Sequence, residues 1–263
     1  MQISLVQPNF RQGGKIFSGY WLPHSIACVY TFVEDKNPGY FDVNRVVFRR
    51  EAVHNASKSM RNDDMVLFSC YMWNWEYNLE LFKRIKEINP DAIIVFGGPQ
   101  VSEFRLEEQQ KEFNWVDSWI VSEGELSFEK LINDLKETGT IQKTYEATRL
   151  MDLDIPSPYI NGFFDNIIKE NPDIKWSTTL ETNRGCPFKC SFCDWGSLTY
   201  SKIKKFPVPK VYQEIEWLGK NKIEYIFVAD ANFGVFPERD SEIVDVMLEV
   251  QDKYGYPKVF NAN

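Results

Sequence analysis

Three cysteines lie within eight residues of one another and are the residues of this sequence best suited to chemistry. Cys186, Cys190 and Cys193 form the pattern C-x3-C-x2-C, directly after a predicted strand at residues 177–182. Thiolates are soft ligands that suit zinc and iron–sulfur clusters. A structural zinc ion takes four ligands, but both histidines and the other two cysteines lie within the first 70 residues. Three thiolates without a nearby fourth ligand favour a cubane cluster that leaves one iron open.

The triad and its surroundings resemble the signature of the radical S-adenosylmethionine superfamily. That signature is C-x3-C-x2-C, usually with an aromatic residue before the last cysteine, and Phe192 holds that place here. The resemblance implies that each cysteine binds one iron of a [4Fe–4S] cluster and that S-adenosylmethionine chelates the fourth iron. An electron from a donor such as flavodoxin or ferredoxin would then cleave S-adenosylmethionine and release a 5′-deoxyadenosyl radical. The alternative is a non-catalytic module in which the same cysteines hold zinc.

The resemblance also assigns contacts with S-adenosylmethionine to residues beside the triad and to the end of the following strand. A predicted strand at residues 225–229 ends in Asp230-Ala231-Asn232, and polar groups at a strand end point into the mouth of a β/α barrel. An Asx turn that caps the next connection is an equal alternative for these side chains, and Trp195 could merely pack the loop. The candidate S-adenosylmethionine ligands are Phe192, Asp194, Trp195, Gly196, Asp230 and Asn232.

Two glycine-containing turns in the first half of the chain point to a second cofactor. The fourth predicted strand is followed by Gly97-Gly98-Pro99, and the fifth by Ser122-Glu123-Gly124-Glu125. Paired glycines let the backbone approach a ligand closely, although they are common in doubly wound folds generally. The turns resemble those of the cobalamin-binding domain that precedes the barrel in one large branch of the superfamily. That branch often has glycine at the position that Ser122 occupies in this chain. The resemblance implies cobalamin contacts at Ser69, Gly97, Gly98, Pro99, Glu123 and Gly124.

The sequence lacks the Asp-x-x-His-x-x-Gly motif with which methionine-synthase-type domains ligate cobalt. Neither His24 nor His54 has the required neighbours, so we expect no histidine on the lower face of a bound cobalamin. A cluster of aromatic residues and one methionine between Tyr71 and Tyr77 follows the third predicted strand. These side chains could form an apolar bed beneath the corrin ring, and ordinary packing explains them equally well.

Strands and helices alternate along the first 140 residues. Short apolar runs predict five strands, and amphipathic patterns between them, such as Leu81, Ile85 and Ile88, predict helices. This alternation predicts an α/β fold, with a doubly wound (Rossmann- or flavodoxin-like) parallel sheet that binds ligands at the carboxyl ends of its strands. The predicted strands are residues 3–6, 43–48, 65–69, 92–96 and 119–121.

A second domain is expected after a polar stretch that contains Pro156, Pro158 and Pro172. Strands at 177–182, 225–229 and from 259 onward alternate with two helical patterns, as in the first part of a radical S-adenosylmethionine partial β/α barrel. The chain stops at Asn263 on a fresh edge strand, so we expect this barrel to be truncated. The predicted division is a cobalamin-binding-like domain at 1–140, a linker at 141–176 and the start of the barrel at 177–263.

The composition and net charge of the chain argue against membrane, secreted and nucleic-acid-binding proteins. Hydrophobic residues make up 43% of the 263 residues, which suits a globular fold. No apolar run has the length of a membrane span, and the N-terminus does not read as a signal peptide. We therefore expect a cytoplasmic protein without a membrane partner. The formal net charge of −8 argues against nucleic acid as a partner.

Together the two resemblances predict a radical S-adenosylmethionine enzyme that also binds cobalamin. In that branch the commonest reaction is methyl transfer to an unactivated carbon, with methylcobalamin supplying the methyl group. The substrate would be a small molecule or a peptide, and the sequence does not identify it. Two alternatives stay open, namely a radical enzyme whose first domain serves only for docking, and the zinc-binding module.

Overall fold

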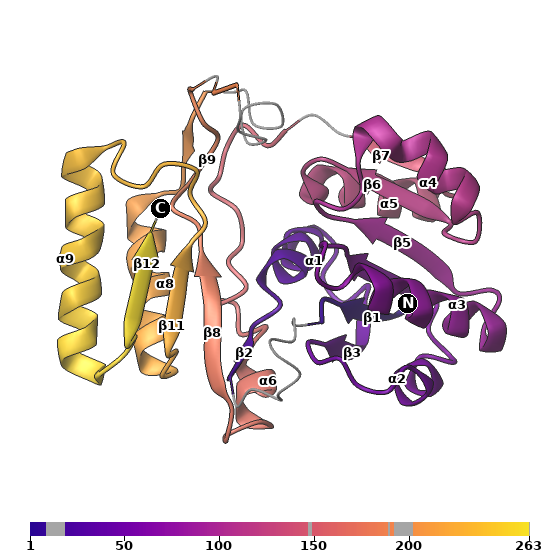
Figure 1. Ribbon diagram of the computed structural model, residues 1–263, viewed down its shortest axis with the longest axis horizontal. Coiled ribbons are helices and arrows are strands. Elements are labelled where there is room, and N and C mark those ends of the chain that lie inside the picture. Colours follow the sequence, from indigo (N-terminus) through magenta and orange to yellow (C-terminus); the bar gives the residue numbers. More distant parts are fainter. Residues whose placement is uncertain (9–18, 147–148, 189, 192–201, 263) are drawn as a thin grey trace. The chain divides into compact units, whose positions relative to one another are not determined.

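The computed structural model describes residues 1–8, 19–146, 149–188, 190–191 and 202–262. Its contacts divide the chain into two compact units (Figure 1). The first unit contains residues 1–8 and the described residues between Ser25 and Leu150. The second contains residues 19–24 and the described residues from Met151 onward. The predicted linker at 141–176 is therefore divided between the two units.

The first unit is built on a parallel sheet in the strand order β3-β1-β4-β5-β6-β7. Every neighbouring pair is parallel, which confirms the predicted doubly wound α/β fold. The strand order reverses between β1 and β4, and ligands bind at such a switch point in flavodoxin-like sheets. The strands are β1 (Gln2–Val6), β3 (Asp42–Val47), β4 (Met65–Ser69), β5 (Ile93–Gly97), β6 (Ser118–Val121) and β7 (Thr144–Glu146).

Both faces of this sheet are buried. Phe96 and Trp119 belong to a core that the strands share with α2 and α3. Leu5 and Leu67 are also buried but lie outside that core, because alternate residues of a strand point to opposite faces. Helices α1 and α5 contact each other and take no part in the first core. The helices are α1 (His24–Lys36), α2 (Val53–Ser59), α3 (Trp75–Ile88), α4 (Leu106–Glu112) and α5 (Gly124–Thr138), with a 3-10 turn, η1 (Glu103–Arg105).

The second unit contains a parallel sheet in the order β12-β11-β8-β2. Three of its strands were predicted, but β2 was not, because a three-residue strand is too short to show an alternating pattern. This strand comes from the beginning of the chain and pairs with β8. The strands are β2 (Gly19–Trp21), β8 (Lys175–Leu180), β11 (Tyr225–Val228) and β12 (Val259–Ala262), with an antiparallel pair of β9 (Asn183–Arg184) and β10 (Lys204–Lys205).

Part of the predicted linker is packed into the second unit. Tyr159 is fully buried, and its hydroxyl group lies 2.8 Å from Thr178 Oγ1 on β8. Its ring contacts the ring of Trp217 on α8 with centroids 5.1 Å apart. The helices of this unit are α6 (Asp165–Lys169), α8 (Val208–Lys220) and α9 (Pro237–Tyr254). Among the described residues, no helix is long and apolar enough to cross a bilayer.

Helices α8 and α9 approach each other closely at Gly219. A Cβ atom at this position would lie 2.3 Å from Val250 Cγ1 and 3.1 Å from Tyr254 Cδ2. Both distances are shorter than ordinary van der Waals contact, and protein interiors have little free volume to absorb them. A glycine at this position therefore permits the observed spacing of the two helices.

Replacing Gly219 by alanine should destabilise the protein by about 1–3 kcal/mol, because overpacking outweighs the gain of about 1 kcal/mol in helix propensity. Denaturant unfolding of the two proteins measures the difference in free energy of unfolding. Adding Val250→Ala should recover part of the loss, since it removes the methyl groups that the new Cβ atom would meet. A Gly219→Ala protein as stable as the wild type would contradict this packing.

Candidate functional site

The first cysteine of the triad follows β9 directly in the second unit. Cys186 is buried, with 8% of its surface exposed, whereas Cys190 is exposed. The third cysteine, Cys193, lies outside the described residues. So do four of the predicted S-adenosylmethionine ligands, namely Phe192, Asp194, Trp195 and Gly196.

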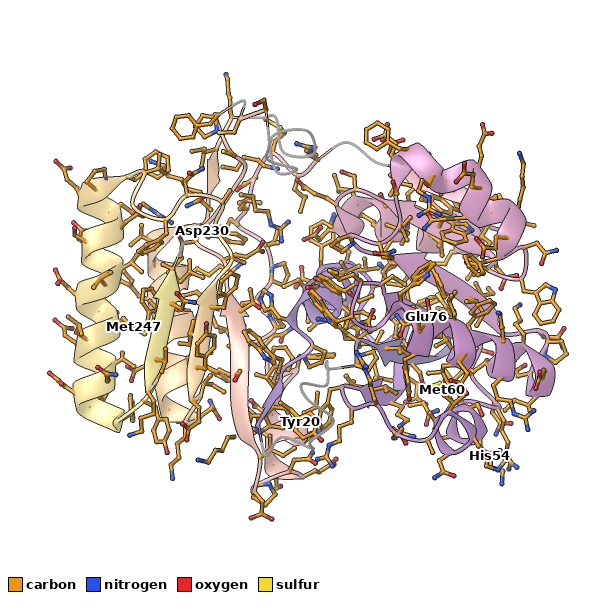
Figure 2. All side chains as sticks on the ribbon, viewed as in Figure 1. Tyr20, His54, Met60, Glu76, Asp230 and Met247 are labelled. Carbon is orange, nitrogen blue, oxygen red and sulfur yellow. The ribbon has the colours of Figure 1, made fainter. Side chains whose placement is uncertain are left out.

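A buried carboxylate joins the ends of two neighbouring strands beside the triad (Figure 2). Asp230 follows β11 and accepts hydrogen bonds from the backbone amides of Thr182 and Asn183, at 2.7 Å and 3.1 Å. It also accepts bonds from the Thr182 hydroxyl group and, at 2.7 Å, from Asn183 Nδ2. We call these three residues the Asp230 network. The network ties β11 to the segment that leads from β8 into the triad.

Burial and hydrogen bonding have opposite effects on the pKa of Asp230. Burial raises the pKa of Asp230 to about 6, while the hydrogen bonds from Thr182 and Asn183 act to lower it. The Arg239 guanidinium group donates to the Thr182 carbonyl oxygen at 2.7 Å and contacts Asp240 at 3.0 Å. Both Asp230 oxygens are therefore engaged with Thr182 and Asn183, and the carboxylate does not form the Asx turn that the sequence offered as an alternative. A contact between Asp230 and S-adenosylmethionine stays a prediction.

The structure brings a second predicted residue directly to the triad. Asn232 Nδ2 donates a hydrogen bond to Cys186 Sγ at 3.0 Å. Cysteine sulfurs that hold iron–sulfur clusters accept hydrogen bonds of this kind. Cys186 and its surroundings therefore fit an iron–sulfur cluster ligand, and the Cys190 thiol is exposed and free to join it.

An ion pair that no sequence motif indicated lies just before the triad. Glu181 accepts hydrogen bonds from Arg184 Nη2 and Nε at 2.8 Å and 3.1 Å. Burial alone would raise the pKa of Glu181, but Arg184 outweighs it and the pKa is lowered. Nearby, burial lowers the pKa of His24 to about 4, and its ring stacks on Tyr159. His24 is therefore a neutral packing residue in this unit at physiological pH.

A further buried acid lies on α8. Glu214 is 7% exposed, and burial raises its pKa to about 7. A hydrogen bond with Ser157 and the charge of Lys210 act in the opposite direction, while Glu181 raises the pKa further. No sequence pattern identified this residue, because a single glutamate in an amphipathic helix has the appearance of a solvent-exposed position.

In the first unit, the glycine pair after β5 lies against the end of β4. The Cys70 amide donates to the Gly97 carbonyl oxygen at 2.7 Å, and the Gln100 amide donates to the Cys70 carbonyl oxygen at 2.9 Å. Gly98 has a φ of 100°, and a Cβ atom there would lie 2.9 Å from Cys70 O. The glycine is thus needed for the approach of two strand ends, and Pro99 beside it is exposed. Their contact with cobalamin stays a prediction.

The end of β4 is fixed by two buried asparagines. The Ser69 carbonyl oxygen accepts hydrogen bonds from Asn74 Nδ2 at 2.9 Å and Asn78 Nδ2 at 3.4 Å. Asn78 is fully buried, and among the described residues its Oδ1 atom has no hydrogen-bond partner. Ser69 itself is 7% exposed, next to the switch point of the sheet.

The aromatic segment after β4 is partly exposed. Tyr71 and Trp73 stack with ring centroids 4.4 Å apart, and Trp73 is 44% exposed. Met72, between them, is 81% exposed, whereas Trp75 packs against the core of the unit. The segment therefore presents an apolar surface at the carboxyl ends of the strands, as the proposed corrin bed requires.

The backbone of the turn after β6 accounts for the small residues Ser122 and Gly124. Ser122 has a φ of 68°, in the left-handed region where glycine is favoured. A Cβ atom at Gly124 would lie 2.7 Å from Val29 Cγ2 on α1, so this glycine permits the contact between α5 and α1. Glu123 accepts a hydrogen bond from the Leu150 amide at 3.1 Å. The described contacts of this turn are thus structural, and its contact with cobalamin stays a prediction.

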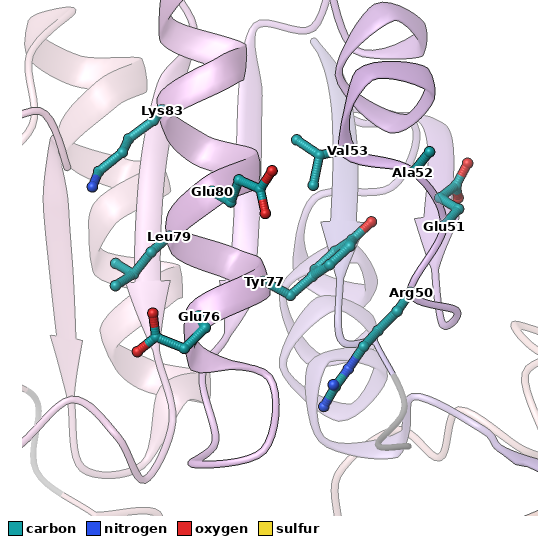
Figure 3. Close-up of a pocket in the computed structure, with 9 residues that line it drawn as sticks. All are labelled: Arg50, Glu51, Ala52, Val53, Glu76, Tyr77, Leu79, Glu80 and Lys83. Atoms are coloured by element: carbon teal, nitrogen blue, oxygen red, sulfur yellow. The ribbon is translucent and has the colours of Figure 1, made fainter. Parts of the chain in front are cut away.

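A cavity of about 620 Å³ lies beside the N-terminal ends of α2 and α3 in the first unit (Figure 3). Acidic and basic side chains both line it. Burial raises the pKa of Tyr77 in its wall to about 12. The cavity is lined by Arg50, Glu51, Ala52, Val53, Glu76, Tyr77, Leu79, Glu80 and Lys83.

No protein-family model matches the chain. The chain is 30% identical to 2-(S-pantetheinyl)-carbapenam-3-carboxylate methyltransferase of Streptantibioticus cattleyicolor, across 97% of this chain and 41% of that protein. It is 31% identical to the cobalamin-dependent radical SAM methyltransferase TokK of Streptomyces tokunonensis, across 92% of this chain and 38% of that protein. The chain thus spans about two fifths of the length of these relatives, and both matches include its two units.

Solved structures share the fold of the chain. The cobalamin-dependent radical enzyme OxsB, with aqua-cobalamin and S-adenosylmethionine bound, superposes with a TM-score of 0.71 at 18% identity, over 98% of this chain and 38% of that chain. The radical methyltransferase TsrM of Kitasatospora setae gives a TM-score of 0.63 at 14% identity, over 96% of this chain and 52% of that chain. At these identities the likeness concerns the fold, and it confirms the predicted order of a doubly wound sheet followed by a partial barrel.

Replacing Ser122 by glycine should stabilise the protein by about 0.5–1 kcal/mol, because the left-handed backbone strains a residue with a side chain. Denaturant unfolding measures the change. The matched control is Ser102→Gly, where φ is −94°. That change only adds freedom to the unfolded chain, so it should leave stability unchanged or lower it. Equal effects of the two substitutions would contradict the strain at Ser122.

Replacing Glu214 by glutamine should make the protein less sensitive to alkali. The folded-state pKa of about 7 lies above the usual glutamate value of 4.5. The stability that Glu214 contributes is therefore fully present below pH 4.5 and is lost as the pH rises through 7. The total loss is on the order of 3 kcal/mol. Denaturant unfolding at several pH values from 5 to 8 should show a shallower decline for Glu214→Gln than for the wild type.

Glu216→Gln, on the same helix, is the control for this experiment. The Glu216 pKa is lowered, chiefly by the hydrogen bond from Lys253, so its contribution is lost only in acid, below the window of measurement. Its profile between pH 5 and 8 should run parallel to that of the wild type. A Glu214→Gln profile that also ran parallel would contradict the raised pKa.

Proposed function

Because the chain belongs to the radical S-adenosylmethionine superfamily, in the branch whose barrel follows a cobalamin-binding domain, we propose that it is the cofactor-binding part of a methyltransferase. The observation that carries this proposal is the pair of named methyltransferases that match the chain across both units. In the proposed reaction, the protein transfers a methyl group to a small-molecule substrate. We place the reaction in the cytoplasm, where the triad cysteines would stay reduced.

In this proposal Cys186, Cys190 and Cys193 hold a [4Fe–4S] cluster, and S-adenosylmethionine binds beside it. When bound, these groups supply a carbon radical and cobalamin supplies the methyl group. The Asp230 network holds the segment before Cys186 in place, and burial keeps water away from the first cysteine. An electron donor such as flavodoxin or ferredoxin would reduce the cluster.

We further propose that cobalamin lies at the carboxyl edge of the first sheet, near the switch point between β1 and β4. The backbone of Gly97 and Gly98 and the Ser69 hydroxyl group would contact it, with Glu123 and Gly124 on the turn after β6. The stacked Tyr71–Trp73 pair, of which Trp73 is exposed, supports an apolar surface there.

The test is anaerobic reconstitution of the protein with iron, sulfide and cobalamin. The wild type should bind about four irons, cleave S-adenosylmethionine in the presence of a strong reductant, and retain a corrin absorbance after gel filtration. Cys190→Ala should lose the iron and the cleavage activity but keep the corrin. Cys28→Ala, which removes a buried thiol of the first unit, is the control and should keep all three.

Three outcomes would count against the proposal, each against a different part. One zinc and no iron in the wild type would favour the zinc-binding module. Cleavage of S-adenosylmethionine by Cys190→Ala would remove the triad from the chemistry. A protein that binds the cluster but no corrin would assign the first unit to docking alone.

A further inference from the structure

One residue outside the triad contacts a triad sulfur directly. The Nδ2 atom of Asn232 lies 3.0 Å from Cys186 Sγ and donates a hydrogen bond to it. Of the two triad thiols that the structure describes, only Cys186 receives a side-chain hydrogen bond from a described residue. The two cysteines therefore enter a cluster in different electrostatic surroundings.

The position of the Asn232 amide is fixed on both sides by buried groups. Before it, Asp230 is anchored to Thr182 and Asn183. After it, Asp240, which is 2% exposed, accepts hydrogen bonds from the backbone amides of Gly234 at 2.8 Å and Phe236 at 3.1 Å. The turn that carries Asn232 is thus clamped to the end of β11 and to the first turn of α9.

The segment that carries the Cys186 sulfur is also fixed by its neighbours. Cys186 is buried and follows Gly185, whose φ of 103° only glycine adopts readily. The preceding residues are tied to β11 by the Asp230 network and to each other by the Glu181–Arg184 ion pair. The N–H···S contact therefore joins two segments that are each held by several hydrogen bonds.

We propose that Asn232 is a positioning residue that raises the reduction potential of the cluster through its hydrogen bond to Cys186. This inference rests on the proposed function, because it requires a [4Fe–4S] cluster on the triad. Reduction adds one electron to the cluster, and the added charge is shared with its sulfur atoms. An N–H dipole directed at one of those sulfurs stabilises the reduced state more than the oxidised state.

The test is a potentiometric titration of the reconstituted protein, followed by electron paramagnetic resonance and carried out without S-adenosylmethionine. Asn232→Leu removes the donor and should shift the one-electron reduction equilibrium roughly tenfold toward the oxidised cluster, about 59 mV to lower potential. Asn232→Asp replaces the donor by a carboxylate of similar size and should shift it further in the same direction. Leaving out S-adenosylmethionine separates this role from any contact of Asn232 with that cofactor.

Asn261→Leu is the matched control, since this amide lies on the neighbouring strand β12 and donates to the Tyr225 hydroxyl group at 2.8 Å. It should leave the potential unchanged. A wild-type potential in both Asn232 variants, or an equal shift in Asn261→Leu, would overturn the inference. Loss of iron from both Asn232 variants with folding retained would also overturn it, because a donor that tunes the potential is not required for loading. Failure of the wild type to bind iron would instead refute the proposed function.

Discussion

The buried carboxylate of Asp230 is the interaction on which the arrangement of the second unit's strand ends depends. Parallel strands are joined by backbone hydrogen bonds only as far as β8 and β11 extend, and beyond them the chain must turn into the triad. Asp230 continues the connection with four hydrogen bonds to Thr182 and Asn183. Burying a carboxylate is unfavourable unless its oxygens are bonded, so the site is stable only when the two strand ends are in register.

In the first unit, close approach of backbone segments at glycines holds strand ends together. In the second unit, the buried Asp230 carboxylate does so. Gly98 and Gly124 each stand where a Cβ atom would collide with a neighbouring segment. These positions hold the carboxyl ends of β4 and β5 together and set α5 against α1. The residues that resemble a cofactor motif therefore have a packing role even without a cofactor. Positions without a side chain are also those where the backbone could approach a ligand closely.

Much of the architecture followed from the sequence, because short apolar runs bounded by turn residues indicate buried strands and amphipathic helices have a clear period. Five of the six strands of the first sheet and the three barrel strands lie within a few residues of their expected positions. Strand β7 was not predicted, because it lies in the segment that the sequence marked as a linker. Strand β2 was missed because its three residues gain their structure from pairing with β8, which is remote in sequence. The triad was recognisable from local spacing. Glu214 and Arg239 were not, since their importance comes from burial and from partners that only the fold brings near.

The order of the chain makes the two described triad cysteines unequal. Cys186 comes directly after β9 and inherits the order of the Asp230 network, whereas Cys190 lies four residues further on and is exposed. Packing therefore fixes the first thiol, and the position of the exposed Cys190 thiol relative to it would be set by the metal. Metal binding at a partly formed site contributes to the free energy of folding. The fold thus supplies a fixed first thiol with its own hydrogen-bond donor, from which a cluster would be built outward in the proposed function.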